Sequence, residues 1–330
     1  MFNNFINIHD FSILYEKIQE KKFFEIIGKI TRSKNYRVKK TWEHVASQKK
    51  QWWDIPAINK RWNYLITGNS EILPHEYVIK KYFPRLVNFG KLKGLSLACG
   101  NGNREIEWAR TGSFITLDAF DISSTRIQKA KKTAEEKLLE NITNFFVADV
   151  KNFSFQKEYY DIVIAEGALH HFSDVKEVVK KIYESLKPGG FLILNDFVGP
   201  SQFQWADKQL KIVNAVLELL PLEYKLQYNN KVKKKVYKPG KISLKLHDPS
   251  EAIESDKILL SIKEIFHQCE IKFYGGTILM LLFKNIAHNF IIEKKITKNL
   301  LQLCFDIEDF FLQNGEIQSD FVYAIFSKKN

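Results

Sequence analysis

The segment GLSLACGNG, residues 94–102, joins a short apolar run to a turn that contains two glycines. An apolar run of this length that ends at glycine predicts a buried strand followed by a tight turn. A predicted helix starts directly afterwards, over residues 104–109. Small residues at such a junction let a ligand approach the backbone at the start of the helix. We therefore expect a nucleotide-type site at Ala98, Cys99, Gly100, Asn101 and Gly102.

The same rhythm of strand and helix continues downstream of this segment. Further strands are expected at 115–120, 144–148, 161–165 and 191–197, with helices at 124–139 and 175–186 and a turn at 187–190. Strands that alternate with helices at this spacing indicate a parallel sheet covered on both faces. After Pro200 the pattern changes to helices at 209–220, 255–266 and 277–315, with strands at 270–274 and 321–326.

This organisation predicts one sheet-based domain over residues 91–330. Two mainly helical insertions are expected in it, at about 200–254 and 276–318, where they would cover a pocket. Residues 1–90 are interpreted as a helical N-terminal extension, either a lid or a dimer contact. Its tryptophan-rich part, residues 51–58 with Trp42 and Trp62 nearby, predicts packing against another element, with a pocket wall as the alternative.

Within the extension, residues 10–30 have helical spacing and residues 33–40 form a basic stretch that indicates a linker. No internal repeat is visible. The composition is that of a folded protein, because 45% of the residues are hydrophobic and 27% are charged. A largely disordered chain is therefore excluded.

Two aspartates follow the second and third predicted strands. Asp121 comes 19 residues after Gly102, where a carboxylate can accept hydrogen bonds from ribose hydroxyls. Asp149 ends the next strand, beside the expected position of an adenine amino group. For either aspartate alone, a helix cap or a turn is the competing interpretation. Their placement at successive strand ends favours a ligand site that includes the following residues, Ile122 and Val150.

Residues 94–197 resemble the S-adenosylmethionine-binding core of the class I methyltransferases. The similarity rests on residues 95–102, on residues 160–171 and on LKPGGFL at residues 186–192. It implies a doubly wound, Rossmann-like α/β fold with a seven-stranded, mostly parallel sheet whose last strand, residues 321–326, is antiparallel. It also implies S-adenosylmethionine as cofactor, S-adenosylhomocysteine as product, and Glu166 among the cofactor contacts.

The resemblance has two departures in its first motif. Ser96 stands where the family usually has an acidic residue, and Ala98 replaces the first glycine. Alanine is small enough to keep the turn. The missing carboxylate often holds the methionine part of the cofactor, and Glu105 or Glu166 is expected to compensate.

Candidates for catalysis follow the fourth and fifth predicted strands. An acceptor hydroxyl needs a general base, and histidine titrates close to neutral pH, so His170 and His171 are candidates. Asp196 ends the fifth strand and is expected to bind or deprotonate the acceptor. Packing or helix capping is the competing interpretation of the histidines. The insertions are expected to add acceptor-binding residues, namely Gln204, Trp205, Glu251 and His288.

The net charge of +12 and the lysine-rich loop at residues 231–241 permit a nucleic acid or another anionic partner without requiring one. No RNA-binding module is recognisable, and residues 165–168, AEGA, lack the motif of enzymes that methylate base nitrogens. Three widely spaced cysteines argue against a metal or disulfide framework and fit a cytoplasmic protein. No signal peptide is expected, and the most apolar stretch, residues 278–283, is too short to span a membrane.

Together these patterns predict methyl transfer from S-adenosylmethionine to a hydroxyl or amine of a small molecule or glycan, which the lysine-rich loop suggests is anionic. A nucleic-acid methyltransferase is the first alternative. A protein that binds S-adenosylmethionine without catalysis is the second, because a fold does not imply a function. A homodimer is left open.

Overall fold

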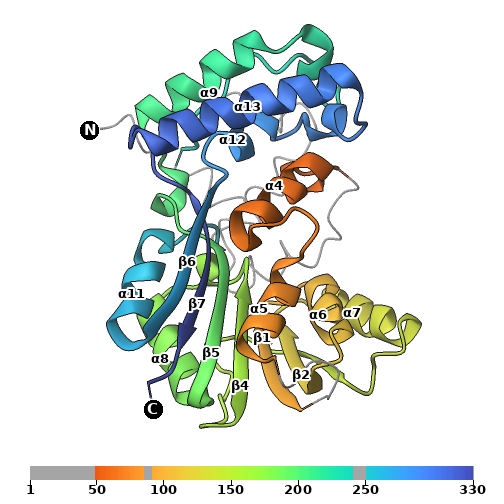
Figure 1. The fold of residues 1–330 in the computed structure, drawn as a ribbon, viewed down its shortest axis with the longest axis vertical. Coiled ribbons are helices and arrows are strands. Elements are labelled where there is room, and N and C mark those ends of the chain that lie inside the picture. The colour runs from red at the N-terminus through yellow and green to blue at the C-terminus, as the bar shows by residue number, and fades with distance from the viewer. Residues whose placement is uncertain (1–48, 85–90, 241–249, 330) are drawn as a thin grey trace, which may run out of the picture.

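The computed structural model describes residues 49–84, 91–240 and 250–329. The expected helix at 10–30 and linker at 33–40 lie outside these ranges. Seven strands form one sheet in the order β3-β2-β1-β4-β5-β7-β6 (Figure 1). The strands are β1 (Leu92–Leu97), β2 (Phe114–Asp121), β3 (Thr143–Val147), β4 (Tyr160–Glu166), β5 (Leu186–Phe197), β6 (His267–Gly275) and β7 (Phe321–Ser327).

All neighbouring strands from β3 to β5 pair in parallel, and β7 pairs antiparallel with both β5 and β6. The predicted fold class, including its antiparallel last strand, is confirmed. The predicted turn at 187–190 is wrong, because these residues form the irregular start of β5. Gly189 there has φ 73°, and the register against β4 shifts between Tyr160 and Ile162. Glycine and proline thus mark a break in the ladder inside the strand.

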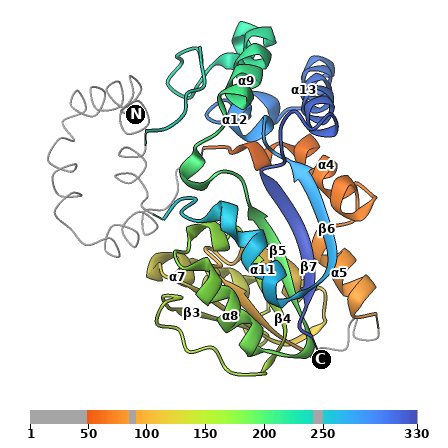
Figure 2. The same cartoon turned by 90° about the vertical axis from the view of Figure 1, so that its left-hand side faces the viewer.

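Helices cover both faces of the sheet because its central strands are apolar on both sides. In β4, Val163 belongs to the cluster beneath α8 (Val175–Ser185) and α11 (Ile258–Ile265), whereas Ile164 belongs to the cluster beneath α4 (Pro56–Thr67) and α5 (Pro74–Tyr82). Adjacent strand residues point to opposite faces, which explains this division. Figure 2 shows α8 and α11 on the side away from α5. Helices α6 (Asn103–Arg110) and α7 (Ser124–Glu136) pack together beside β2 and β3.

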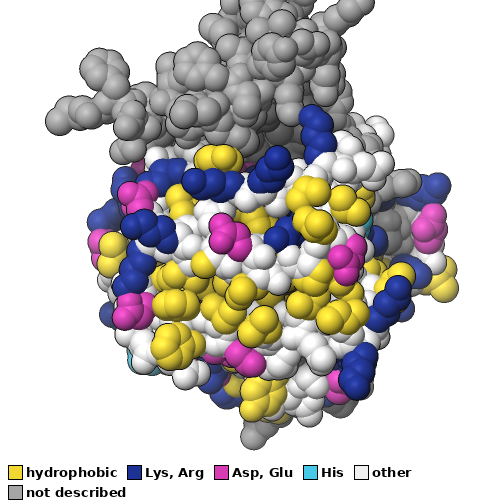
Figure 3. Space-filling view, turned by 90° about the horizontal axis from the view of Figure 1, so that it is seen from above, with side chains coloured by type: hydrophobic (Ala, Val, Ile, Leu, Met, Phe, Trp, Pro, Cys, Tyr) yellow, Lys and Arg dark blue, Asp and Glu magenta, His cyan; other side chains and the backbone are white. Residues whose placement is uncertain are grey.

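A second helical body lies beyond one end of the sheet (Figure 1). It combines α4 and the preceding turn η2 (Trp52–Asp54) with α9 (Asp207–Leu219), α12 (Leu279–Phe283) and α13 (Lys295–Gln313), which share one buried apolar cluster. We call this body the cap. Its outer face carries exposed apolar side chains among lysines and acidic residues (Figure 3). On α9 and α13, Leu219, Leu303 and Phe310 are exposed. Within the described ranges, no helix combines the length and apolar character that a membrane crossing needs.

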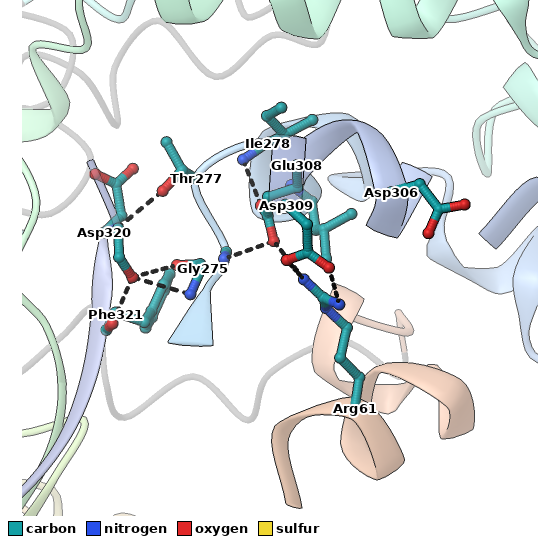
Figure 4. Close-up of polar contacts among 12 residues, drawn as sticks. Arg61, Gly275, Thr277, Ile278, Asp306, Glu308, Asp309, Asp320 and Phe321 are labelled. Atoms are coloured by element: carbon teal, nitrogen blue, oxygen red, sulfur yellow. Dashed lines mark hydrogen bonds and ion pairs between the residues drawn. The ribbon is translucent and has the colours of Figure 1, made fainter. Parts of the chain in front are cut away.

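Polar contacts fasten α4 to the rest of the cap (Figure 4). Arg61 of α4 donates two hydrogen bonds to Asp309 of α13, at 2.9 and 2.5 Å, and lies 3.8 Å from Glu308. Glu308 is fully buried and accepts hydrogen bonds from the backbone N–H groups of Ile278 and Leu279, at 2.8 and 3.2 Å. One carboxylate of α13 therefore caps the start of α12, while its neighbour holds α4.

Candidate active site

A cavity of about 620 Å³ lies between the carboxyl ends of the parallel strands and the cap. The residues predicted to contact the cofactor line it, except Gly102: they are Ala98, Cys99, Gly100, Asn101, Asp121, Ile122, Asp149, Val150 and Glu166. Gly102 instead faces the protein interior. A Cβ atom there would lie 2.7 Å from Ala130 and 2.8 Å from Phe145, so glycine lets α6 pack against α7 and β3.

The glycine turn is held in place by Asp121. Backbone φ is positive at Ala98 (49°), Gly100 (56°) and Gly102 (74°), which reverses the chain between β1 and α6. Asp121 is nearly buried and accepts hydrogen bonds from the N–H groups of Gly100 and Ser123, at 3.0 and 2.8 Å. The carboxylate thereby fixes the turn to the end of β2, and it still lines the cavity.

A buried carboxylate of α6 faces the same part of the cavity. Ser96 donates a hydrogen bond of 2.7 Å to Oε1 of Glu105, which is 3% exposed and lines the cavity. Oε2 of Glu105 has no hydrogen-bond partner among the described residues. Burial raises the pKa of this carboxyl to about 7. An N–H donor on a bound ligand, such as the ammonium group of an amino acid, would give Oε2 a hydrogen-bond partner.

Glu166, at the end of β4, is more fully engaged. Its Oε1 accepts a hydrogen bond of 2.9 Å from the indole N–H of Trp108. Its Oε2 lies 3.6 Å from Nε of Arg104 and 3.4 Å from the amide nitrogen of Asn195. Arg104 and Asn195 both line the cavity and were not predicted as site residues.

On the same cavity wall, His170 is held by Asp196. Asp196 is 1% exposed, and its Oδ2 accepts hydrogen bonds from the N–H groups of Ala168 and Leu169, at 3.1 and 2.7 Å. Its Oδ1 forms a hydrogen bond with Nδ1 of His170. This arrangement fixes the imidazole ring and directs the lone pair of a neutral ring to Nε2.

Glu251 brings a second carboxylate to the histidines. Its oxygens lie 3.8 Å from Nε2 of His170 and 3.8 Å from Nδ1 of His171. The ligand atoms of these three residues lie within 4.8 Å of one another. Two histidines and a glutamate are also a zinc donor set, and a carboxylate behind one histidine is typical of such sites. The same groups can instead transfer a proton without a metal.

A further part of the cavity wall is aromatic and apolar, and it combines residues of the cap with residues of β6 and β7. It contains Trp52, Trp53, Trp62, Phe203, Tyr274, Met280 and Phe321. The indole N–H groups of Trp52 and Trp62 have no hydrogen-bond partner in the described part of the chain. For the tryptophans, the sequence left open both packing and a pocket wall, and Trp52 does both because it also belongs to the cap cluster. Nothing in the sequence predicted Met280 or Phe321 as residues of the site.

Of the predicted acceptor-binding residues, Glu251 lines the cavity, and Gln204, Trp205 and His288 do not. Trp205 is 3% exposed and stacks on Phe203, with ring centroids 4.9 Å apart. Gln204 donates hydrogen bonds to two backbone carbonyls, and the His288 ring lies 4.0 Å from the Tyr228 ring. These side chains therefore support the cap behind the cavity wall.

The lysine-rich loop is also partly structural. Lys233 is 9% exposed and donates hydrogen bonds to the backbone carbonyls of Leu281, Leu282 and Lys284, at 2.8–2.9 Å. It thus caps the end of α12. Lys238 pairs with Asp207 at 3.0 Å, and Lys241 lies outside the described residues. The loop is consequently not a continuous row of solvent-exposed charges.

Comparisons with known proteins agree with this architecture. Residues 89–264 match a family described as a methyltransferase domain. Over 104 residues the chain is 30% identical to the 27-O-demethylrifamycin SV methyltransferase of Amycolatopsis mediterranei, a match that covers 32% of this chain and 38% of that protein. Over 110 residues it is 29% identical to the malonyl-[acyl-carrier protein] O-methyltransferase of Priestia megaterium, covering 33% and 38%. The chain therefore spans less than half the length of these curated relatives.

A solved structure extends the similarity of fold. The phosphoethanolamine N-methyltransferase 2 of Haemonchus contortus, in complex with phosphomonomethylethanolamine and S-adenosylhomocysteine, has a TM-score of 0.50 and 12% identity. This match covers 89% of the present chain and 61% of that one. The family match spans more than half of the chain, which belongs to the class I S-adenosylmethionine-dependent methyltransferases. S-adenosylmethionine is the cofactor of this class.

Proposed function

We propose that this protein transfers the methyl group of S-adenosylmethionine to a hydroxyl group of a small molecule or glycan. The observation that carries the proposal is the His170 side chain, which Asp196 holds on the wall of the cavity. When bound, S-adenosylmethionine supplies an electrophilic methyl group. A hydroxyl acceptor must lose its proton as its oxygen attacks, so a base at this position serves the reaction.

His170 is the residue that takes this proton. The carboxylate of Asp196 accepts the Nδ1–H group and leaves Nε2 as the basic atom, and its charge stabilises the imidazolium that forms. Asp196 is buried and accepts three backbone hydrogen bonds besides, so we assign it a positioning role and not the role of the base. Glu251, 3.8 Å from Nε2, offers a carboxylate that can orient the acceptor hydroxyl.

The cavity wall supports an acceptor with a flat or apolar body. Large aromatic surfaces such as Trp52, Trp53 and Phe321 favour rings and hydrocarbon, and the unpartnered indole N–H groups can donate to acceptor oxygens. The engagement of Lys233 and Lys238 removes part of the support for a nucleic-acid or anionic acceptor. A cytoplasmic location and a homodimer remain predictions from the sequence.

The test is a transfer assay with methyl-labelled S-adenosylmethionine and three acceptor classes: aromatic and macrocyclic alcohols, oligosaccharides, and RNA. We expect label in a hydroxyl acceptor and none in RNA. Transfer to RNA alone would contradict the proposal, as would the absence of transfer by protein that binds the cofactor. Dialysis against EDTA is the control, and turnover should survive it. Loss of turnover that a divalent cation restores would reassign His170, His171 and Glu251 to a metal site.

A further inference from the structure

The first strand and the helix after it share a charged contact that departs from the family pattern. Ser96 of β1 occupies the position where an acidic residue is usual, and its hydroxyl donates to Glu105 on α6. Glu105 is 3% exposed and lines the cavity. A carboxyl group is therefore present at this end of β1, and it comes from the first turn of α6.

One oxygen of Glu105 lacks a partner. Oε1 accepts the serine hydroxyl, whereas Oε2 is buried without a hydrogen bond from any described residue. A buried carboxylate oxygen without a donor costs free energy, and native proteins keep few such groups. An orphaned oxygen on a cavity wall is accounted for when a ligand supplies the missing donor. A cationic N–H donor gives the strongest such bond.

The other charged residues nearby are placed differently. Glu166 already accepts the indole N–H of Trp108 and lies 3.6 Å from Arg104, so its charge is partly balanced within the protein. Arg104 is adjacent to Glu105 in the chain, lines the same cavity, and leaves 55% of its side chain exposed. One wall thus offers a carboxylate that needs a cation and a guanidinium that can bind an anion. An α-amino acid carries both of these groups.

We propose that Glu105 binds the α-ammonium group of the methionine part of S-adenosylmethionine, and that Arg104 binds its α-carboxylate. Helix α6 thereby supplies the charge that the first strand lacks at Ser96. The proposal rests on the cofactor of the proposed function and is independent of the acceptor. Asp121, at the end of β2, remains the residue expected to accept hydrogen bonds from the ribose. The two carboxylates would therefore bind different parts of one ligand.

Calorimetry with a matched pair of ligands tests the proposal without any turnover. S-adenosylhomocysteine contains the amino-acid part, and 5′-methylthioadenosine lacks it while keeping the neutral sulfur, the ribose and the adenine. Glu105→Gln should weaken S-adenosylhomocysteine binding at least tenfold, since a hydrogen bond to a charged group is lost, and should leave 5′-methylthioadenosine binding unchanged. Arg104→Gln should show the same selectivity.

Two variants serve as controls. Glu107→Gln changes a half-exposed carboxylate on the same helix that does not line the cavity, and it should affect neither ligand. Asp121→Ala should weaken both ligands roughly tenfold or more, because both contain the ribose. Glutamine can still accept the Ser96 hydroxyl, so Glu105→Gln should fold, and its retained binding of 5′-methylthioadenosine demonstrates this.

Each other outcome has a defined meaning. Unchanged binding of both ligands by Glu105→Gln would overturn the role of Glu105. An equal loss for both ligands would also overturn it, since the residue would then shape the whole site. An unaffected Arg104→Gln would overturn the carboxylate contact alone. If the unaltered protein bound neither ligand, the cofactor assignment itself would fall, and the proposed function with it.

Discussion

The two sides of the cavity are built in different ways. The proposed cofactor side comes from consecutive strand ends and the turn after β1, and residues 98–126 and 148–151 supply most of it. The proposed acceptor side comes from positions far apart in the chain, at 52–62, 203, 250–253, 274–280 and 321. The first side needs only the parallel sheet, whereas the second needs the cap to be in place. The cofactor side is thus fixed by local geometry, and the acceptor side by tertiary packing.

This difference predicts that variants separate into two groups, those that alter cofactor binding and those that alter only the use of the acceptor. His170→Ala should show the largest effect. We expect turnover to fall by about 10²–10⁴-fold, the usual contribution of a general base, with S-adenosylhomocysteine affinity unchanged. His171→Ala, the matched control, should lose less, because Asp196 holds His170. Steady-state kinetics and calorimetry check this. A parallel loss of cofactor affinity would contradict the separation of the variants into two groups.

A smaller effect is expected on the free energy of unfolding, through the buried carboxyl group of Glu105. Burial raises the pKa of Glu105 to about 7, so the folded state resists ionising a group that ionises near pH 4.5 when unfolded. Stability should therefore fall as pH rises through this interval and remain lower above it. Glu105→Gln removes that penalty and should raise the free energy of unfolding by at most about 3 kcal/mol above pH 7. Urea unfolding without cofactor measures it. An equal gain at about pH 5 would contradict the explanation.

The smallest predicted effect concerns the turn itself. Ala98 has φ 49°, a left-handed conformation that costs alanine more than glycine. Ala98→Gly should therefore stabilise the protein by roughly 0.5–1 kcal/mol, after the entropy of glycine is subtracted. Ala109→Gly, in the last turn of α6, should destabilise it instead. Chemical denaturation distinguishes the two signs. Destabilisation by Ala98→Gly would mean that packing of the Ala98 methyl group outweighs backbone strain.

The sequence predicted the sheet well because its signals are local. Apolar runs that end in Gly or Asp located β1 to β4, and the resemblance implied the antiparallel β7. The same local reasoning failed at residues 187–190, where glycine and proline interrupt a strand without ending it. It also could not distinguish Glu105 from Glu166, since they differ in their tertiary contacts: Glu166 has Trp108, Arg104 and Asn195 as partners, and Glu105 has only Ser96 among the described residues.

The acceptor side was predicted less completely, for a physical reason. The segment 202–205 was singled out, yet Phe203 lines the cavity and Trp205 stacks behind it. The backbone is left-handed at Gln202 (φ 54°) and Phe203 (φ 51°), and this conformation sets which side chain faces the cavity. Neither residue type is one that predicts a left-handed backbone. The burial of Lys233 could not be predicted either. This lysine lies in a basic stretch of sequence, but its ammonium group donates hydrogen bonds to backbone carbonyls of α12. Such choices depend on partners distant in the chain.

The contacts of Arg61 bear on how this protein can be recombined with relatives. The sheet from β1 to β5 is one continuous piece of chain, residues 92–197, and a gene fusion could exchange it as a block. The cap is assembled from separate pieces, and Arg61 of α4 meets Asp309 of α13 across 248 residues. A chimera that inherits α13 without α4 would leave buried Glu308 without the neighbouring guanidinium of Arg61. New acceptor preferences should therefore be inherited with α4 and α13 together.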